Sequence, residues 1–361
     1  MNARNAAAAG RNPIAALLLG LGALVLTVLA AGWRGAAASY LAAWLALLAL
    51  PVGALPIAIV LERFGLRRHD HGEGELSKAL RRLVALMPVA AILGIPVLVG
   101  IGRIYPWVHA APETPLAAVW FTVPLFALRV VAYLAAWIWL AARFVVPAED
   151  RADGRTVSSV ALHAIVGTLA VTDLVGSLDH RLGSSLEGLL VLTAWSGLAL
   201  AAAILLAPEE PAPIGRGRAV PGQDRLVPLV VLLSLWAFLH FVQFLIVWSA
   251  NLPQEVMWYF ARGGWLGRAF AGFGGAVVLL GALATLRPGR PTTRVLAALT
   301  VVLHTVEMFW FVTPALRDRF VIRISDVFAA VAVGCLALAL RPLARRLLPL
   351  ASPRRRRSAA A

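Results

Sequence analysis

The sequence contains ten apolar runs that are each long enough to cross a membrane as a helix. The hydrocarbon core of a bilayer is about 30 Å thick and needs roughly 20 helical residues. Pro, Gly or charged residues separate the runs, and they lack the alternating pattern of membrane β-strands. We therefore predict an all-α polytopic membrane protein with about ten transmembrane helices. The predicted spans are 13–32, 38–61, 83–102, 116–142, 157–177, 185–206, 226–249, 265–286, 295–314 and 324–340.

Composition supports a single integral membrane domain over residues 1–361. Hydrophobic residues make up 60% of the chain and charged residues 14%, whereas soluble domains carry about 25% charged residues. Such a chain is expected to contact membrane lipid. The net charge of +15 does not indicate nucleic acid as a partner, because the Arg residues lie in short connections and at the C-terminus rather than on one continuous face.

The distribution of Lys and Arg predicts which connections face the cytoplasm, because cytoplasmic loops carry the excess of these residues. Of the 33 Lys and Arg residues, 24 lie at the two termini and in the even-numbered connections, and only seven lie in the odd-numbered connections. Both termini are therefore predicted to be cytoplasmic. The same count predicts a cytoplasmic loop at 62–82, an outer-side interfacial loop at 250–264 and a basic cytoplasmic tail at 341–361.

The first apolar run also has features of a cleavable signal peptide. Arg4 and Arg11 precede it, and small residues follow it at Ala36 to Ala38. We favour a retained span, because the run from Pro13 to Trp33 is longer than a usual signal core and no soluble segment follows it.

The sequence does not predict a metal centre built by this chain alone. Cys335 is the only cysteine, which excludes an internal disulfide, an iron–sulfur cluster and a thiolate zinc site, and no c-type haem motif is present. A cluster in the loop 62–82 has the residue types of a metal site, but its glycines favour a solvated loop. The cluster consists of His69, Asp70, His71, Glu73 and Glu75.

Ionisable side chains inside the spans are the candidate functional residues. Such a group at the membrane centre costs about 2.5–3.5 kcal/mol on insertion scales, so it faces a bundle interior and marks a functional site. We select His163 and Asp173 on the fifth span, and His304 and Glu307 on the ninth, as candidate proton-transfer residues. Arg129 on the fourth span is expected to pair with one of the acids. The predicted topology places both acids in the outer half of the membrane.

Spacing leaves alternatives open for these groups. His304 and Glu307 are three residues apart and share a helix face, as do His240 and Gln243. Each pair is a candidate relay step or a structural hydrogen bond, and we favour the structural interpretation for His240 and Gln243. His240 and His304 also raise a b-type haem, which needs two imidazoles at similar depth. A stand-alone transporter or channel would use the same buried acids.

The stretch from the seventh span through the seventh connection is the most distinctive part of the sequence. It reads Gln-Phe-Leu-Ile-Val-Trp-Ser-Ala-Asn-Leu-Pro-Gln-Glu over residues 243–255, followed by Trp258-Tyr259 and by Arg-Gly-Gly-Trp over residues 262–265. This stretch resembles the ActF family of membrane subunits in bacterial alternative complex III, a quinol:cytochrome c oxidoreductase.

Shorter segments in the fifth and ninth spans are also similar to that family. The sequence departs from the family pattern at Leu174, where the family has Trp, and Glu307 lies near the family's acid without aligning to it. The similar segments are Asp173, Ser177-Leu178, Ser184-Ser185, Phe309-Trp310 and Pro314.

The resemblance implies a core subunit of a quinol:electron-acceptor respiratory complex in the bacterial cytoplasmic membrane. It implies an NrfD-like and polysulfide-reductase-like fold, with four-helix bundles formed by spans two to five and six to nine, plus peripheral helices. It also implies no haem in this chain, leaves quinone binding open, and assigns the redox centres to iron–sulfur and cytochrome c partner subunits, so the chain would not be catalytic alone.

Five residues of the distinctive stretch are candidates for partner contact or local structure. Because Glu255 and Arg262 are two helical turns apart, they are expected to contact a partner or each other. The alternative is a lipid-facing amphipathic segment. The five are Trp248, Asn251, Pro253, Glu255 and Arg262.

Overall fold

The computed structural model describes residues 12–63, 74–112, 114–145, 154–208 and 223–348. Nine helical stretches within these ranges are apolar and long enough to cross a membrane. The helices are α2 (Pro13–Arg63), α3 (Glu75–Val84), α4 (Met87–Leu93), α5 (Ile95–Val99), α6 (Ile101–Ile104), α7 (Pro115–Trp120), α8 (Val123–Val145), α9 (Gly154–Leu174), α10 (Glu187–Leu206), α11 (Gln223–Ala250), α12 (Pro253–Arg262), α13 (Gly264–Leu286), α14 (Arg290–Arg317) and α15 (Ile324–Leu347), with short 3-10 helices at η1 (Pro106–Val108) and η2 (Gly176–Leu178).

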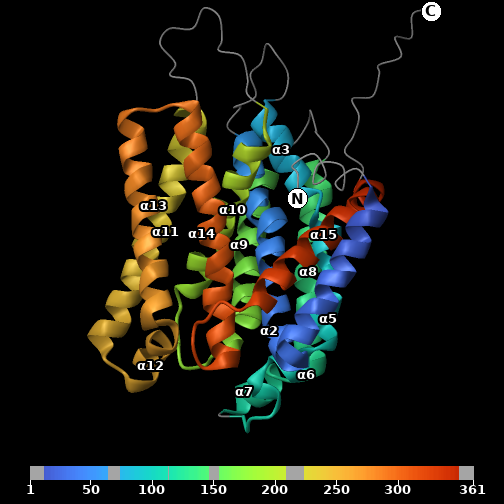
Figure 1. Cartoon of the computed structure of the whole chain (residues 1–361), viewed down its shortest axis with the longest axis vertical. Coiled ribbons are helices and arrows are strands. Elements are labelled where there is room, and N and C mark those ends of the chain that lie inside the picture. The colour runs from blue at the N-terminus through green and yellow to red at the C-terminus, as the bar shows by residue number, and fades with distance from the viewer. Residues whose placement is uncertain (1–11, 64–73, 113, 146–153, 209–222, 349–361) are drawn as a thin grey trace, which may run out of the picture.

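Helix α2 contains the first two predicted spans. Its 51 residues would measure about 75 Å as one straight helix, more than twice a bilayer core, but Gly32 breaks it with φ 64° and ψ 174°. A positive φ costs little at glycine because glycine has no Cβ. Figure 1 shows two blue rods diverging from this break. The connection predicted at 33–37 is therefore helical, and the single residue Gly32 separates the two spans.

The helices form two four-helix bundles, as the resemblance implies. The second half of α2 packs with α3 to α6, α8 and α9, while α10, α11, α13 and α14 form the second bundle. Helix α15 lies outside both and packs along α2 (Figure 1). The bundles meet closely where Gly53 of α2 faces α10, because a Cβ at this position would lie 2.0 Å from the carbonyl oxygen of Trp195.

Helix breaks are concentrated in the first bundle. The span predicted at 83–102 is divided among α3 to α6, with Pro residues in the first turn of α4 and α5, which end the preceding helical hydrogen bonds. Buried side chains then donate hydrogen bonds to the carbonyl groups that lack a helical partner. The Trp44 indole N–H donates to the carbonyl of Ala90 at 2.8 Å, and the Tyr40 hydroxyl donates to that of Leu93 at 2.8 Å.

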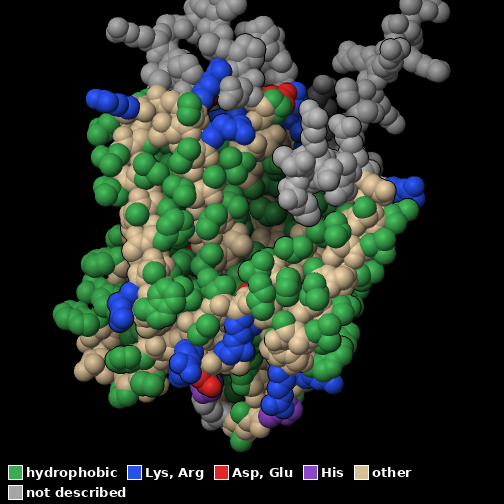
Figure 2. All heavy atoms as spheres, viewed as in Figure 1, with side chains coloured by type: hydrophobic (Ala, Val, Ile, Leu, Met, Phe, Trp, Pro, Cys, Tyr) green, Lys and Arg blue, Asp and Glu red, His purple; other side chains and the backbone are tan. Residues whose placement is uncertain are grey.

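Apolar side chains cover the middle of the molecule, and Lys and Arg side chains lie toward its two ends (Figure 2). This distribution is that of a polytopic membrane protein. Helices α6, α7 and α12 lie at one end, which is called the α12 end below, and α2 begins and α15 finishes at the other (Figure 1). The start of α2 and the end of α15 lie at the same end of the molecule because the chain crosses between its two ends an even number of times.

Three segments predicted as loop or tail contain helix. Helix α3 begins at Glu75 inside 62–82, α12 occupies most of 250–264, and α15 continues to Leu347 inside 341–361. Charge pairing supports the start of α3, because Lys78 bonds Glu75 at 2.7 Å. Residues His69, Asp70, His71 and Glu73 of the proposed loop cluster lie outside the described residues.

Candidate functional site

Glu307 is the centre of a buried hydrogen-bonded cluster between α11 and α14. Its side chain is fully buried. Its Oε1 accepts a hydrogen bond from the Trp236 indole at 2.7 Å and lies 2.8 Å from Nε2 of His240. Its Oε2 lies 2.8 Å from Nδ1 of His304. The carboxylate is thus held between two imidazoles, which are the side chains that titrate near neutral pH.

Helical spacing on both helices builds this cluster. His304 and Glu307 are three residues apart on α14, and Trp236 and His240 are four apart on α11, so each pair shares a face. Close packing on the far side holds His304 in place, because a Cβ at Gly197 of α10 would lie 2.8 Å from its Nε2. The predicted His304–Glu307 contact is present, while His240 contacts Glu307 and Gln243 instead contacts Ser184.

His240 is the open side of the cluster. Its side chain is 21% exposed, whereas those of His304 and Glu307 are 1% and 0% exposed. A proton that reaches Glu307 from this side therefore passes through His240. Nε2 of His240 and Nδ1 of His304 both face the carboxylate, which leaves one further ring nitrogen on each imidazole.

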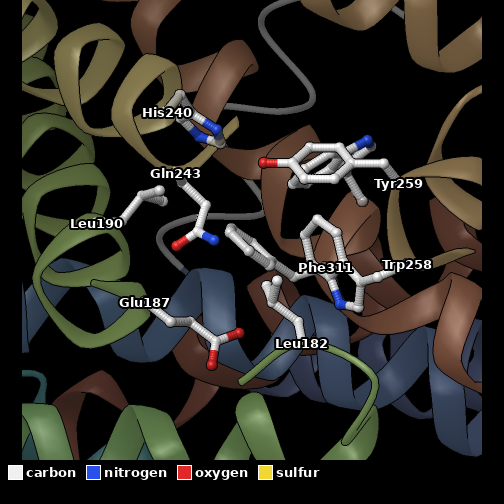
Figure 3. Close-up of a pocket in the computed structure, with 9 residues that line it drawn as sticks. Leu182, Glu187, Leu190, His240, Gln243, Trp258, Tyr259 and Phe311 are labelled. Carbon is white, nitrogen blue, oxygen red and sulfur yellow. The ribbon is translucent and has the colours of Figure 1, made fainter. Parts of the chain in front are cut away.

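A pocket lies beside His240 and is lined in part by Trp258 and Tyr259 of α12. It contains about 230 Å³ of space, its mouth included, which is below the usual range for a drug-sized ligand of about 300–1,000 Å³. Figure 3 shows Gln243 between His240 and Glu187. The aromatic side chains of Trp258, Tyr259 and Phe311 lie across from these three residues. The lining residues are Leu182, Glu187, Leu190, His240, Gln243, Trp258, Tyr259, Trp310 and Phe311.

Asp173 belongs to a different cluster, in the first bundle. Arg129 pairs with it through two hydrogen bonds of 2.7 and 2.9 Å, which confirms the expected pairing of Arg129 with a buried acid. The Tyr133 hydroxyl adds a hydrogen bond of 2.8 Å. Arg129 also donates to the carbonyl of Trp120 at 2.8 Å, where α7 ends. This cluster therefore joins α9 to the break between α7 and α8.

The partners of the two acids give them different chemistry. Arginine stays charged in proteins, so Asp173 faces a fixed cation that neither accepts nor releases protons. Glu307 faces imidazoles that do both. The geometry favours a structural role for Asp173 and a proton-handling role for Glu307.

His163 lies apart from both acids. It is 5% exposed, and no described residue forms a hydrogen bond with its Nδ1. Ten residues of α9 separate it from Asp173, or about 15 Å along the helix axis. The four residues predicted for proton transfer thus occupy three places, and only His304 and Glu307 are in contact.

The distinctive stretch forms the end of α11 and helix α12. Asn251 ends α11 with φ 49°, and Pro253 occupies the first turn of α12, where its missing N–H costs nothing. Trp248 is 68% exposed and Glu255 is half-buried, so both are available to lipid or a partner. Arg262 is 2% exposed and points into the protein.

Arg262 holds α12 onto the second bundle. It bonds Asp179 at 3.0 Å and the carbonyl of Phe311 at 2.8 Å, and its guanidinium lies 3.6 Å from the centre of the Trp258 ring. The structure thus pairs Arg262 with Asp179, rather than with Glu255 as the spacing allowed. Burial lowers the pKa of Arg262 to about 10, against the opposing attraction of Asp179.

Asp179 is shared by two arginines. Arg181 binds it through two hydrogen bonds of 2.7 and 2.8 Å, and Arg262 approaches from α12. Burial by itself raises the pKa of the Asp179 carboxyl, but hydrogen bonds and charge from the two guanidinium groups outweigh burial and hold this pKa below its ordinary value.

Sequence reasoning missed several members of these clusters. Trp236 and Tyr133 each lie four residues from a selected or paired polar residue, His240 and Arg129, and this spacing was the available signal. Glu187 lacked such a signal, because it stands at the edge of its span.

No family model matches the sequence, and no curated protein sequence matches it. The resemblance to the ActF family therefore stays a prediction.

Proposed function

We propose that this chain is a membrane subunit of a quinol-oxidising respiratory complex and that it handles protons at Glu307. The observation that carries the proposal is the Glu307 carboxylate held 2.8 Å from both His240 and His304 within the second bundle. Oxidation of a quinol releases protons together with electrons, so such a complex needs titratable groups at membrane depth. The resemblance in residues 243–265 supports the same assignment.

In this proposal, other subunits handle the electrons. Iron–sulfur and cytochrome c subunits would hold the redox centres, and this chain would support assembly and proton movement without being catalytic alone. The membrane would be the bacterial cytoplasmic membrane, with both termini in the cytoplasm and the α12 end outside, as the charge distribution favours.

The pocket beside His240 is the candidate quinone-binding site of this chain. Its aromatic walls, which include Trp258 and Phe311, suit a ring. Its volume limits it to part of a head group unless α12 moves. Quinone binding is therefore the secondary part of the proposal.

Purification tests the assembly. The chain should co-migrate on a native gel with redox subunits identified by mass spectrometry. A chain that migrates alone, with no redox partner in any mild detergent, would contradict the proposal.

Proton measurements test the site. In the purified complex reconstituted in liposomes, Glu307→Gln should lower the protons released per quinol or the turnover rate. Asp318→Asn is the matched control, because Asp318 is an exposed carboxylate at the α12 end with a left-handed backbone that Asn tolerates. Equal proton yield and rate in the two variants would remove the proton role.

A stand-alone transporter remains the alternative, and the helix breaks do not favour it. Transporters of that kind place broken helices at corresponding positions in two halves. Here the breaks lie at Gly32 of α2 and in α3 to α8, while α10, α11, α13 and α14 run continuously over 20 to 28 residues each.

A further inference from the structure

We propose that Glu187 exchanges protons with Glu307 through His240 across the pocket, and that it passes them to the α12 end. This inference rests on the proposed proton role of Glu307. It assigns a function to a residue that lies outside the Glu307 cluster and supplies the group missing between that cluster and the surface.

The position of Glu187 is unusual for a carboxylate. It is the first residue of α10, it is 9% exposed, and it lines the pocket. Gly176 makes room for it, because a Cβ there would lie 2.6 Å from its Oε2. No described residue donates a hydrogen bond to its carboxylate in the structure, whereas Asp173 and Asp179 each have a bidentate arginine.

The neighbouring Arg262 forms no hydrogen bond with Glu187. Its Nη1 donates to Asp179 and to the carbonyl of Trp258 and its Nη2 to the carbonyl of Phe311, while its buried Nε has no partner among the described residues. It therefore acts on Glu187 as a nearby charge rather than as a bonded partner. A buried carboxylate without a fixed partner takes up and releases protons more readily than a paired one.

The pocket connects Glu187 to His240. Figure 3 shows them at opposite ends with Gln243 between, and Ser184 bonds the Gln243 amide oxygen, which fixes its position. The roughly 230 Å³ of the pocket includes open solvent, and its enclosed part has room for about one water. Leu182 and Leu190 line the rest, so a water here would bridge the polar groups.

The proton step balances without a redox partner. An imidazolium at His240 gives a proton to a pocket water, and that water gives a proton to the Glu187 carboxylate. His240 becomes neutral and Glu187 becomes a neutral acid, which then releases its proton at the α12 end. Return of His240 to its charged form takes a proton from the Glu307 side.

Charged groups of both signs lie near Glu187. Arg262 favours the carboxylate, and Asp179 favours the protonated acid. Tyr259 and Arg181 keep their protons near neutral pH, and His240 is the proton donor of the proposal. The groups on the packed elements are Arg262 and Tyr259 on α12, His240 on α11, and Asp179 and Arg181 in the connection before α10.

A carbodiimide tests whether Glu187 takes up a proton in a reachable site. Dicyclohexylcarbodiimide adds to a protonated carboxyl group and forms a stable N-acylurea, which peptide mass spectrometry locates. In the purified full chain, Glu187 should be labelled more at pH 5 than at pH 8, and Asp173, bound to Arg129, should stay unlabelled. Absence of a Glu187 adduct across this range, with the reagent active on exposed Asp318, would overturn the inference.

Proton release from the reconstituted complex tests the transfer itself. Glu187→Gln should slow quinol-driven proton release by roughly tenfold or more and shift its pH profile, and Glu187→Asp should restore part of the rate. Asp318→Asn should leave the rate unchanged. A structural role alone would lower the melting temperature in Glu187→Gln without changing the pH profile.

The two proposals fail in different ways. If Glu307→Gln impairs proton release and a folded Glu187→Gln variant does not, the Glu187 inference is wrong and the proposed function stands. If neither variant changes proton release, both are wrong.

Discussion

Nε2 of His240 lies 2.8 Å from Oε1 of Glu307, which joins α11 to α14 in the interior of the second bundle. Glu307 is closed to its surroundings, and His240 is partly open to the pocket. The pair therefore connects a buried acid to the pocket. A hydrogen bond between two titratable groups allows a proton to transfer from one group to the other without movement of either helix.

Replacing Glu307 with Gln removes this charge while keeping the size of the side chain. Trp236 retains an acceptor, but each imidazole loses a charge-assisted hydrogen bond, worth about 1.5–3 kcal/mol when made to a charged group. We expect a lower melting temperature together with impaired proton release. Thermal unfolding in detergent, followed by tryptophan fluorescence, measures the first effect. A variant with unchanged stability would mean that the carboxylate is not charged in the native protein.

The Arg129–Asp173 pair should behave as a structural unit. Asp173→Asn leaves a buried guanidinium without its counter-charge, a change that costs about 3–5 kcal/mol in buried pairs. The double variant Arg129→Met with Asp173→Asn should lose less stability than the sum of the two single variants. A double-mutant cycle on the free energy of unfolding in mixed micelles measures the coupling, and additive losses would contradict it.

Asp179 should make stability pH-dependent at the acid end. Its pKa is held below the ordinary value in the folded protein, so the folded state favours the charged form. That stabilisation is complete above the unfolded pKa of about 3.9 and is lost as the pH falls through the lower folded pKa. The melting temperature should drop below about pH 4, and Asp179→Asn should flatten this drop. Asp318→Asn, which leaves both arginine contacts intact, should not.

Gly53 should be irreplaceable at the junction of the two bundles. A Cβ there would lie 2.0 Å from the backbone oxygen of Trp195, so Gly53→Ala has to separate α2 from α10. Overpacking of this kind costs about 1–3 kcal/mol. Gly22→Ala is the matched control, because no atom lies within 4 Å of the new Cβ. Equal melting temperatures for the two variants would show that the junction adapts.

Sequence patterns were sufficient for the elements and for some of their contacts. Apolar run length predicted the spans, because hydrocarbon imposes a minimum length on a helix that crosses it. Local spacing predicted the His304–Glu307 contact, because residues three apart share a helix face. The rarity of charge in the spans predicted that Arg129 would find an acid.

Other features depended on which helices became neighbours. Spacing indicated His304 as one partner of Glu307, but only packing brought His240 to the same carboxylate and Arg129 to Asp173. Arg262 has Glu255 two turns away on its own helix, but the packing of α12 onto the bundle brings it to Asp179 instead. Glu187 and His240 line one pocket only because α10 and α11 pack together.

The sequence by itself determined that this is a helical membrane protein, roughly where its helices lie, and which polar residues it buries. These properties follow from hydropathy and helical period, which act over a few turns of chain. Tertiary structure alone decided the partner of each buried group, because burial in a bundle requires that every charge be satisfied by whichever side chain another helix presents. The ten apolar runs thus set the architecture, and the contact between His240 and Glu307 defines the site.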